Sequence, residues 1–427
     1  MKFENIFTQY NDDIEKSVDV DPLGFGSIWT YFGQQIFENK ISSATFDIRN
    51  FNINLFNHYV VKKLSMNNEY IKDAMFRNKK ETIEKLFIVL ENMLIYSWWE
   101  NQSDWGENRK GLLGTSKAIS KWLGSNKIEE YFDISKKFND LELLKNQKTT
   151  GLNGTYKGSF IAMFNSDNND NENLTKDYDK YYENGELFKE IQEIIEKNKD
   201  FKTLSDKVIT IFDDQKIDTS KIPTEEYSKV FKNHKKISNH TKGFWLEHLG
   251  FKSKEAKLIY DEIDFKRGID EIINRASSKE DSSKFAKIIS LEPKLNYYEK
   301  LFYYLLQKDG ILIKELEKEE CIAFDYSFDD ELDGMEDEVI AKERLENLSN
   351  VNSIGEFIEY HEKMMAERGE KSPWIRIEND KIKVTNINAV TDDIDKDELT
   401  TILKDKLWGE RLYYIGTVAS IKRGFEQ

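Results

Sequence analysis

Few residues of this chain have the type and spacing that catalysis requires. The best combination is Asp214-Gln215-Lys216, an acid-x-Lys triplet that follows the apolar run 208–212 and has further aspartates upstream. In metal-dependent nucleases of the restriction type, carboxylates on neighbouring strands hold Mg²⁺ and a lysine assists the attacking water. Asp214 and Lys216 are therefore candidate catalytic residues of such a nuclease, with Mg²⁺ as the cofactor. Because 33% of the chain is charged, triplets of this kind also arise by chance.

The other reactive residue types lack partners at the spacing that a site needs. The sequence 361–365 begins like a zinc-protease helix with His361, but Met365 occupies the position of the second histidine. The single Cys321 borders an acidic segment, whose carboxylates would raise the pKa of its thiol. Neither a phosphate-binding glycine loop nor a Gly-x-Ser-x-Gly sequence is present. The sequence therefore predicts no catalytic residues, no metal and no cofactor, with the Mg²⁺ nuclease as the alternative.

The charge of the chain bears on its partners. The 427 residues include 79 acidic and 63 basic side chains, which gives a net charge of −16. This charge disfavours non-specific binding to nucleic acid, because counterion release requires the protein to carry the cations. The excess is uneven, since the segment 319–338 holds ten carboxylates and no lysine or arginine. The argument against nucleic acid thus applies to the chain average and leaves room for a local basic groove.

The acidic segment 319–338 has two interpretations. As a solvated linker it needs no partner. Alternatively, it is a docking strip for a basic partner or a mimic of nucleic acid, because three aromatic residues interrupt the acids. The residues of this partner strip are Phe324, Asp325, Tyr326, Phe328, Asp329 and Asp330.

The compartment follows from what the sequence lacks. No apolar run reaches 18 residues, so no transmembrane helix is expected. The first residues, 1–5, have neither the basic nor the apolar region of a signal peptide. With one cysteine, the chain is no disulfide scaffold. We expect a reduced, cytoplasmic protein that contacts no membrane.

Hydrophobic periodicity predicts a mainly α-helical protein. Apolar residues recur at i, i+3 and i+4 in six stretches, at 80–99, 184–198, 223–236, 253–275, 282–307 and 395–420. Pro223 and Pro293 are expected in first helical turns. The sequence 21–26 reads as a turn leading into a helix that Ser27 caps. The run 208–212 fits a strand or a helix equally well.

The clearest β signal lies at 373–385. Isoleucine and valine alternate there with charges on either side of Asn379-Asp380, which predicts a hairpin. This hairpin could be the wing of a winged-helix-like module. The fold class expected is a multi-domain helical protein with a small β hairpin near the C-terminus.

Composition suggests domain boundaries and candidate binding residues. We expect an N-terminal helical domain at 1–164, a central helical domain at 175–318, an acidic linker at 319–338 and a C-terminal module of helix and hairpin at 339–427. Cations and an aromatic residue are the candidate contacts to partners, namely Arg49, Trp374, Arg376, Lys381, Lys383 and Arg411.

Three segments together resemble a group of poorly characterised bacterial proteins encoded near anti-phage defence genes. The segments are 21–26 with Thr45 and 49–51, then 151–158, and finally 361–368 with 373–375 and 408–414. The resemblance covers both ends of the chain and implies a biological context, phage defence with partner subunits, without a mechanism. The function it favours is an accessory or structural subunit of a bacterial defence system that binds other subunits and, through a basic surface, DNA. The nuclease and an acidic DNA mimic or inhibitor are the alternatives.

Overall fold

The structure of the chain is a computed structural model. It describes residues 21–101, 105, 112, 115, 131–144, 146–165, 186–212, 216–232, 234–252, 254–263, 269–277, 283–336, 339–367, 369, 372–386, 394–409 and 414–426. This part of the chain holds nineteen α-helices and two antiparallel sheets of two strands each, which confirms the expected fold class.

The chain folds as two compact units, and neither is a continuous segment. Unit 1 consists of residues 1–36 and 261–415, and unit 2 consists of residues 37–260 and 416–427. The boundary expected at 165–174 lies inside unit 2, and the linker expected at 319–338 lies inside unit 1. The difference arises because composition is a local property, whereas a unit is completed by segments that return from distant parts of the chain.

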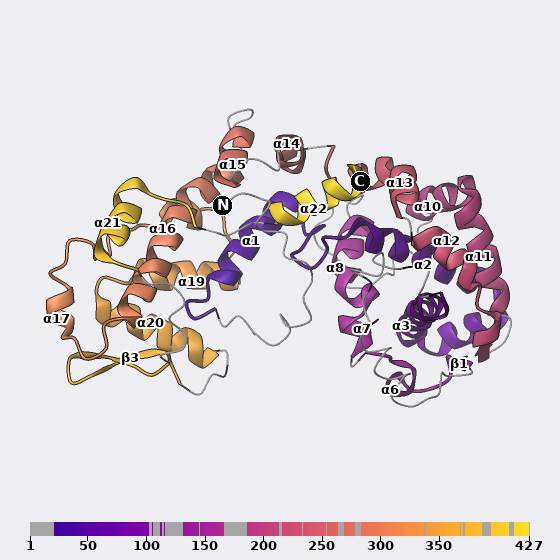
Figure 1. The fold of residues 1–427 in the computed structure, drawn as a ribbon, viewed down its shortest axis with the longest axis horizontal. Helices are drawn as coiled ribbons and strands as arrows, with labels where there is room; N and C mark the ends of the chain where they lie inside the picture. Colours follow the sequence, from indigo (N-terminus) through magenta and orange to yellow (C-terminus); the bar gives the residue numbers. More distant parts are fainter. Residues whose placement is uncertain are drawn as a thin grey trace. The chain divides into compact units, whose positions relative to one another are not determined.

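The elements of unit 1 surround one long helix (Figure 1). They are α1 (Phe25–Phe37), α15 (Ile269–Ser277), α16 (Ser283–Leu306), α17 (Ile313–Leu316), α18 (Asp329–Leu332), α19 (Ile340–Ser349), α20 (Ile354–Glu367), β3 (Ile375–Glu378), β4 (Lys381–Val384) and α21 (Lys396–Asp405). Pro293 lies inside α16 and not in a first turn as expected. Residues 291, 295, 298, 301, 302 and 305 of α16 are fully buried, so this helix forms the centre of the core.

The hairpin of unit 1 is the one that the sequence predicts. Ile375 pairs with Val384 and Ile377 with Ile382, and both turn residues, Asn379 and Asp380, have positive φ. Positive φ at both central residues is the signature of the tight hairpin turn that Asn and Asp tolerate. The segment 310–313, which follows α16, pairs with β4 through backbone hydrogen bonds. These bonds hold the hairpin against the C-terminal end of α16.

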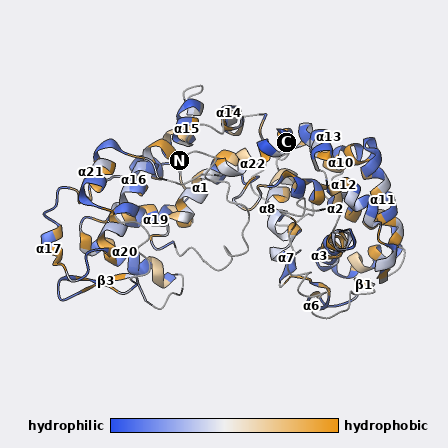
Figure 2. Ribbon diagram, viewed as in Figure 1, coloured by the Kyte–Doolittle hydropathy of each residue, from blue (hydrophilic) through white to orange (hydrophobic). Residues whose placement is uncertain are grey.

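Unit 2 is a bundle of helices with one small sheet (Figure 1). Its elements are α2 (Ile48–Asn67), α3 (Glu69–Glu100), β1 (Tyr131–Asp133), α6 (Phe138–Leu141), α7 (Gln147–Thr150), α8 (Leu152–Asn165), α10 (Glu186–Lys197), α11 (Lys199–Ile211), β2 (Lys216–Asp218), the 3-10 turn Thr219–Lys221, α12 (Thr224–Phe231), α13 (His234–His248), α14 (Lys254–Glu262) and α22 (Ile415–Glu426). Surface helices such as α11 are amphipathic and carry both hydrophilic and hydrophobic residues (Figure 2).

Helix α2 is buried on nearly all sides although it is rich in asparagine. One of these asparagines, Asn52, finds all its partners on another helix: it donates to Ser238 at 3.2 Å and accepts from Thr241 at 2.7 Å and Trp245 at 2.8 Å. A buried amide is tolerated only when such partners exist, because an unpaired one costs about 1–3 kcal/mol. These bonds therefore fix how α13 packs on α2.

Each of the six amphipathic stretches contains at least one α-helix within its described residues. The stretches 223–236, 253–275 and 395–420 are each divided between two helices, and 208–211 belongs to α11 and not to a strand. At the N-terminal end, α1 begins at Phe25, and Asp21 replaces Ser27 as its cap. The carboxylate of Asp21 accepts from the backbone N–H of Phe25 at 3.0 Å and of Gly26 at 2.7 Å. The prediction of Ser27 as the cap was wrong, because its hydroxyl donates to the carbonyl of Gly24 at 3.0 Å, whereas Asp, which is as good a cap as Ser, is available at position 21.

The net charge is distributed unevenly between the two units. Unit 1 contains 44 acidic and 25 basic residues, a net charge of −19, whereas unit 2 contains 35 acidic and 38 basic residues, a net charge of +3. The total of −16 is thus carried by unit 1 alone. Electrostatic repulsion of phosphates therefore concerns unit 1, where the hairpin lies, and not unit 2.

Candidate interaction surface

The acidic segment is not a linker but a strap fastened along α16. We call residues 319–331 the strap. Three α16 side chains on one helix face hold it at successive points. Tyr304 donates to Glu319 at 2.5 Å. Tyr297 donates to the carbonyl of Cys321 at 2.9 Å and accepts from the N–H of Ala323 at 2.7 Å.

Lys294 fastens the far end of the strap. Its ammonium group donates to the carbonyl of Ser327 at 2.7 Å and to both carboxylate oxygens of Glu331, at 2.8 and 3.0 Å, and lies 5.1 Å from the centre of the Phe328 ring. Glu331 is fully buried, so Lys294 neutralises a carboxylate that water does not reach. With Tyr297 and Tyr304 it makes the strap run antiparallel to α16.

The aromatic residues of the expected partner strip face the core of unit 1. Phe328 has 0% exposure, and Phe324 and Tyr326 are half-buried. All three rings surround Tyr298 of α16, with centroid distances of 5.9–6.4 Å. These aromatics therefore pack within the unit, and their contact with a partner stays a prediction. Burial of Phe328 alone contributes about 2 kcal/mol.

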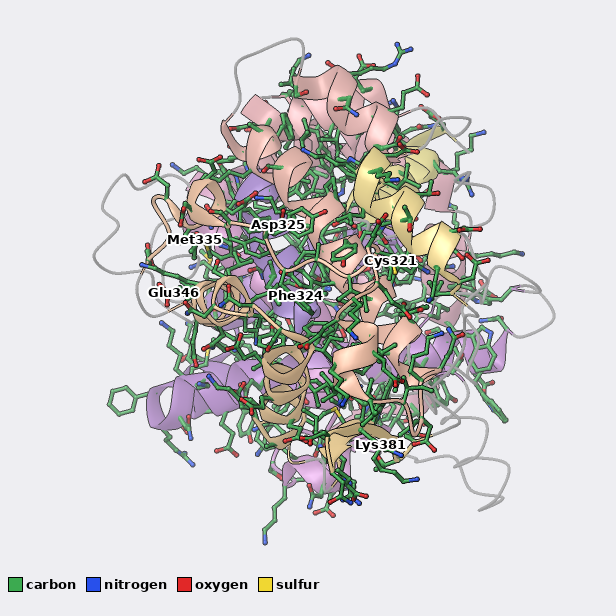
Figure 3. The ribbon with its side chains drawn as sticks, turned by 90° about the vertical axis from the view of Figure 1, so that its left-hand side faces the viewer. Cys321, Phe324, Asp325, Met335, Glu346 and Lys381 are labelled. Carbon is green, nitrogen blue, oxygen red and sulfur yellow. The ribbon has the colours of Figure 1, made fainter. Side chains whose placement is uncertain are left out.

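The acids of the strip point the other way. Asp325, Asp329 and Asp330 are exposed, and within the described parts of the chain none of them lies in an ion pair. Figure 3 shows Phe324 and Asp325 in the middle of the strap, between Cys321 and Met335. Because the backbone is clamped, these carboxylates are presented by an ordered segment. A strap that is already ordered before a partner binds lowers the entropy cost of binding. That cost is about 0.5–1.5 kcal/mol for each side chain that must be immobilised.

Burial also decides the state of the one cysteine. Cys321 is buried, and its burial together with the nearby Glu319 carboxylate raises the pKa of the thiol. The expectation that acidic neighbours raise this pKa is confirmed, although burial is the larger cause. A thiol in this state is a poor nucleophile.

The candidate cations of the hairpin lie on its exposed face, and acidic side chains lie on the same face. Arg376 stands opposite Lys383, and Glu378 stands opposite Lys381, so the face carries both signs. Arg376 is paired with Glu378, and Lys383 lies 3.6 Å from Asp309. This is a face of mixed charge in a unit with a net charge of −19, which is poor support for a DNA-binding wing.

His361 connects the hairpin to the start of the chain. Its Nε2 accepts from the backbone N–H of Trp374 at 2.9 Å, so Nδ1 carries the proton and donates to the carbonyl of Pro22 at 2.9 Å. Burial lowers the pKa of His361 to about 4. Trp374, a candidate partner contact, is half-buried, with its ring 6.3 Å from that of Phe302. His361 therefore has a structural role in its neutral form.

This arrangement predicts acid sensitivity. Between pH 6.5 and pH 4 the unfolded chain binds a proton at His361 and the folded chain does not, so stability falls as the pH falls. The contribution of His361 amounts to about 2 kcal/mol between pH 6.5 and pH 5. Urea unfolding at pH 7 and at pH 5 gives the difference in the free energy of unfolding between the two pH values. In His361→Gln this difference should be smaller than in the wild type by about 2 kcal/mol. The exposed His240→Gln should keep the full difference, and an unchanged difference in His361→Gln would refute the assignment.

The other candidate residues fare differently. Arg49 is 3% exposed and lies 3.5 Å from Asp47, so it is part of the core of unit 2 and not a surface contact. Arg411 and Asp214 lie outside the described residues.

Lys216 lies in β2, opposite Asp133 of β1, but the Asp133 carboxylate accepts from the N–H and hydroxyl of Ser135, at 2.9 and 2.6 Å. The run before the triplet is helical, unlike the strand that the nuclease hypothesis uses.

Sequence reasoning missed a buried carboxylate in unit 2. Glu91 of α3 accepts from the backbone N–H of Asn153 at 2.6 Å and from the side chain of Gln147 at 3.1 Å, and so caps the start of α8. Burial raises the pKa of Glu91 to about 7. Gly151 lies against it, because a Cβ there would come within 2.5 Å of the carboxylate and 2.4 Å of the Gln147 carbonyl. The glycines at 151–158 were the available signal, since a glycine before a helix marks a close approach.

Comparisons with known proteins add nothing to these observations. No family model, no curated protein and no solved structure matches the chain. No described helix is long and apolar enough to span a bilayer. In the described ranges, no group of three or more His, Cys, Asp or Glu side chains is arranged to hold a metal.

Proposed function

We propose that this chain is a non-catalytic accessory subunit of a bacterial anti-phage defence system, and that the exposed carboxylates of its strap bind a basic surface of another subunit. One observation carries the proposal: Asp325, Asp329 and Asp330 are exposed on a strap that is clamped at both ends, and none of the three has an ion-pair partner among the described residues. The defence setting rests on the resemblance of the three sequence segments.

A protein partner fits this surface better than nucleic acid does. The strap lies in the unit with a net charge of −19, which repels phosphates and attracts a basic surface over roughly the Debye length of 8–10 Å. Contact with DNA is assigned to unit 2, whose net charge of +3 does not repel phosphates. Charge pairs at such a rim act mainly on the rate of association, so binding should weaken steeply with added salt.

The test is purification of the tagged full chain from cells that express its neighbouring genes. The variant Asp325→Asn/Asp329→Asn/Asp330→Asn should recover at least tenfold less of the partner, because it removes three unpaired charges and leaves the clamps intact. The control Glu346→Gln/Glu359→Gln/Asp405→Asn removes three exposed charges elsewhere in unit 1 and should recover the partner normally. Equal recovery by both variants would remove the strap from the interface, and no co-purifying protein at low salt would remove the proposal.

A further inference from the structure

The first two turns of α3 present a mixed face with one fully exposed aromatic residue. Ile71 is buried, and the opposite side of the helix carries Glu69, Asp73, Phe76 and Arg77, all of them exposed. Phe76 has 92% of its side chain exposed, which is the highest value among the large apolar residues described. Leaving a phenylalanine in water forgoes about 2 kcal/mol of burial.

A break in the helix sets this face apart. Asn78 has non-helical angles, φ −155° and ψ 89°, and its side chain accepts from the N–H of Glu81 at 3.2 Å, which caps the remainder of α3. The segment 69–77 is thus a short helix of its own. Its single buried anchor, Ile71, leaves the other side open to another protein.

We propose that this face pairs with the same face of a second copy of the chain, with the two helices antiparallel. The order of charge along the face selects this occupant: Asp73 precedes Arg77 by one turn, and the two are ion-paired within the helix. An antiparallel two-fold arrangement places Asp73 of each copy opposite Arg77 of the other and turns two pairs into a network of four charges. A parallel arrangement would instead place like charges together.

The helix repeat places Phe76 at the centre of this contact. The two-fold axis passes midway between residues 73 and 77, at residue 75, so Phe76 of each copy lies about 1.5 Å along the helix from the axis. The two rings then cover each other and lose contact with water. One face of two turns is far smaller than the roughly 800 Å² per partner of a stable interface, so the pairing is weak and concentration-dependent. It does not depend on the strap.

Sedimentation velocity of the full chain between about 1 and 200 µM, at low salt, tests the pairing. The wild type should shift from monomer toward dimer, and Phe76→Glu should raise the dissociation constant at least tenfold. Asp73→Arg and Arg77→Asp, each alone, should weaken pairing similarly, because each places like charges opposite each other. The double swap Asp73→Arg/Arg77→Asp should restore it, since the reversed order is again complementary to itself.

A matched control distinguishes this contact from non-specific hydrophobic association. Ile340→Glu changes another exposed apolar residue, 60% exposed and in unit 1, and should leave the dissociation constant unchanged. A wild-type chain that stays monomeric at every concentration overturns the proposal and assigns the face to a different protein. Dimerisation that survives Phe76→Glu, or that the double swap does not restore, also overturns it.

Discussion

Lys294→Met should lower the free energy of unfolding by about 3 kcal/mol or more, which is the usual cost of leaving a buried charge without its partner. Glu331 has no exposure, and Lys294 is its only ion-pair partner among the described residues. Without the lysine, the carboxylate must either stay unpaired or pull the strap toward water. Urea unfolding gives the stability, and hydrogen exchange of residues 319–331 should show the strap losing protection first.

The double variant Lys294→Met/Glu331→Leu is the control for this result. It removes both charges and fills the space with apolar atoms, and such a replacement is often neutral or stabilising. It should therefore recover most of the loss, apart from the bond of Lys294 to the Ser327 carbonyl. A loss below about 1 kcal/mol in the single variant would mean that the strap is not clamped at this end.

Two glycines of one helix region should respond in opposite directions. Gly151→Ala should destabilise unit 2 by about 2–3 kcal/mol, because its Cβ would meet the backbone carbonyl of Gln147 and the Glu91 carboxylate, and neither can give way cheaply. Gly158→Ala should stabilise it by about 0.5–1 kcal/mol, because Gly158 lies within α8 and a Cβ there meets nothing within 4 Å.

Thermal or urea unfolding of the two variants measures this contrast. The pair is its own control, since the same substitution is made at two positions seven residues apart, one just before α8 and one inside it. If both variants are neutral, Glu91 does not cap α8. If both destabilise, the glycines serve chain flexibility and not packing.

Local patterns account for the fold class. Periodicity at 3.6 residues located the helices, and alternation around Asn379-Asp380 located the hairpin, because both depend on residues within a few positions of one another. Local rules allowed strand or helix at 208–211, and the structure has a helix there; the predicted cap of α1, Ser27, was wrong, and Asp21 takes that role. Tertiary packing decides such ties, because propensities differ by less than 1 kcal/mol per residue.

The candidate surface could be predicted only in part. The sequence identified the acids and aromatics of the strip, but alternation in an extended segment says nothing of which side meets the core. Burial of Phe328 and the clamps from α16 supply that answer. The same holds for Arg49, which composition presented as a surface cation and which the core of unit 2 encloses.

What the sequence by itself determined is therefore the helical class, the hairpin, the charge of each segment and the absence of familiar catalytic motifs. Only the tertiary structure showed that the chain closes into two discontinuous units, that Glu91 caps a helix 62 residues away and that His361 binds the carbonyl of a residue 339 positions earlier. The physical reason is the range of the interaction. A turn or a helical period is set by neighbours, whereas any of 79 carboxylates could reach a distant amide, and folding alone selects which one does.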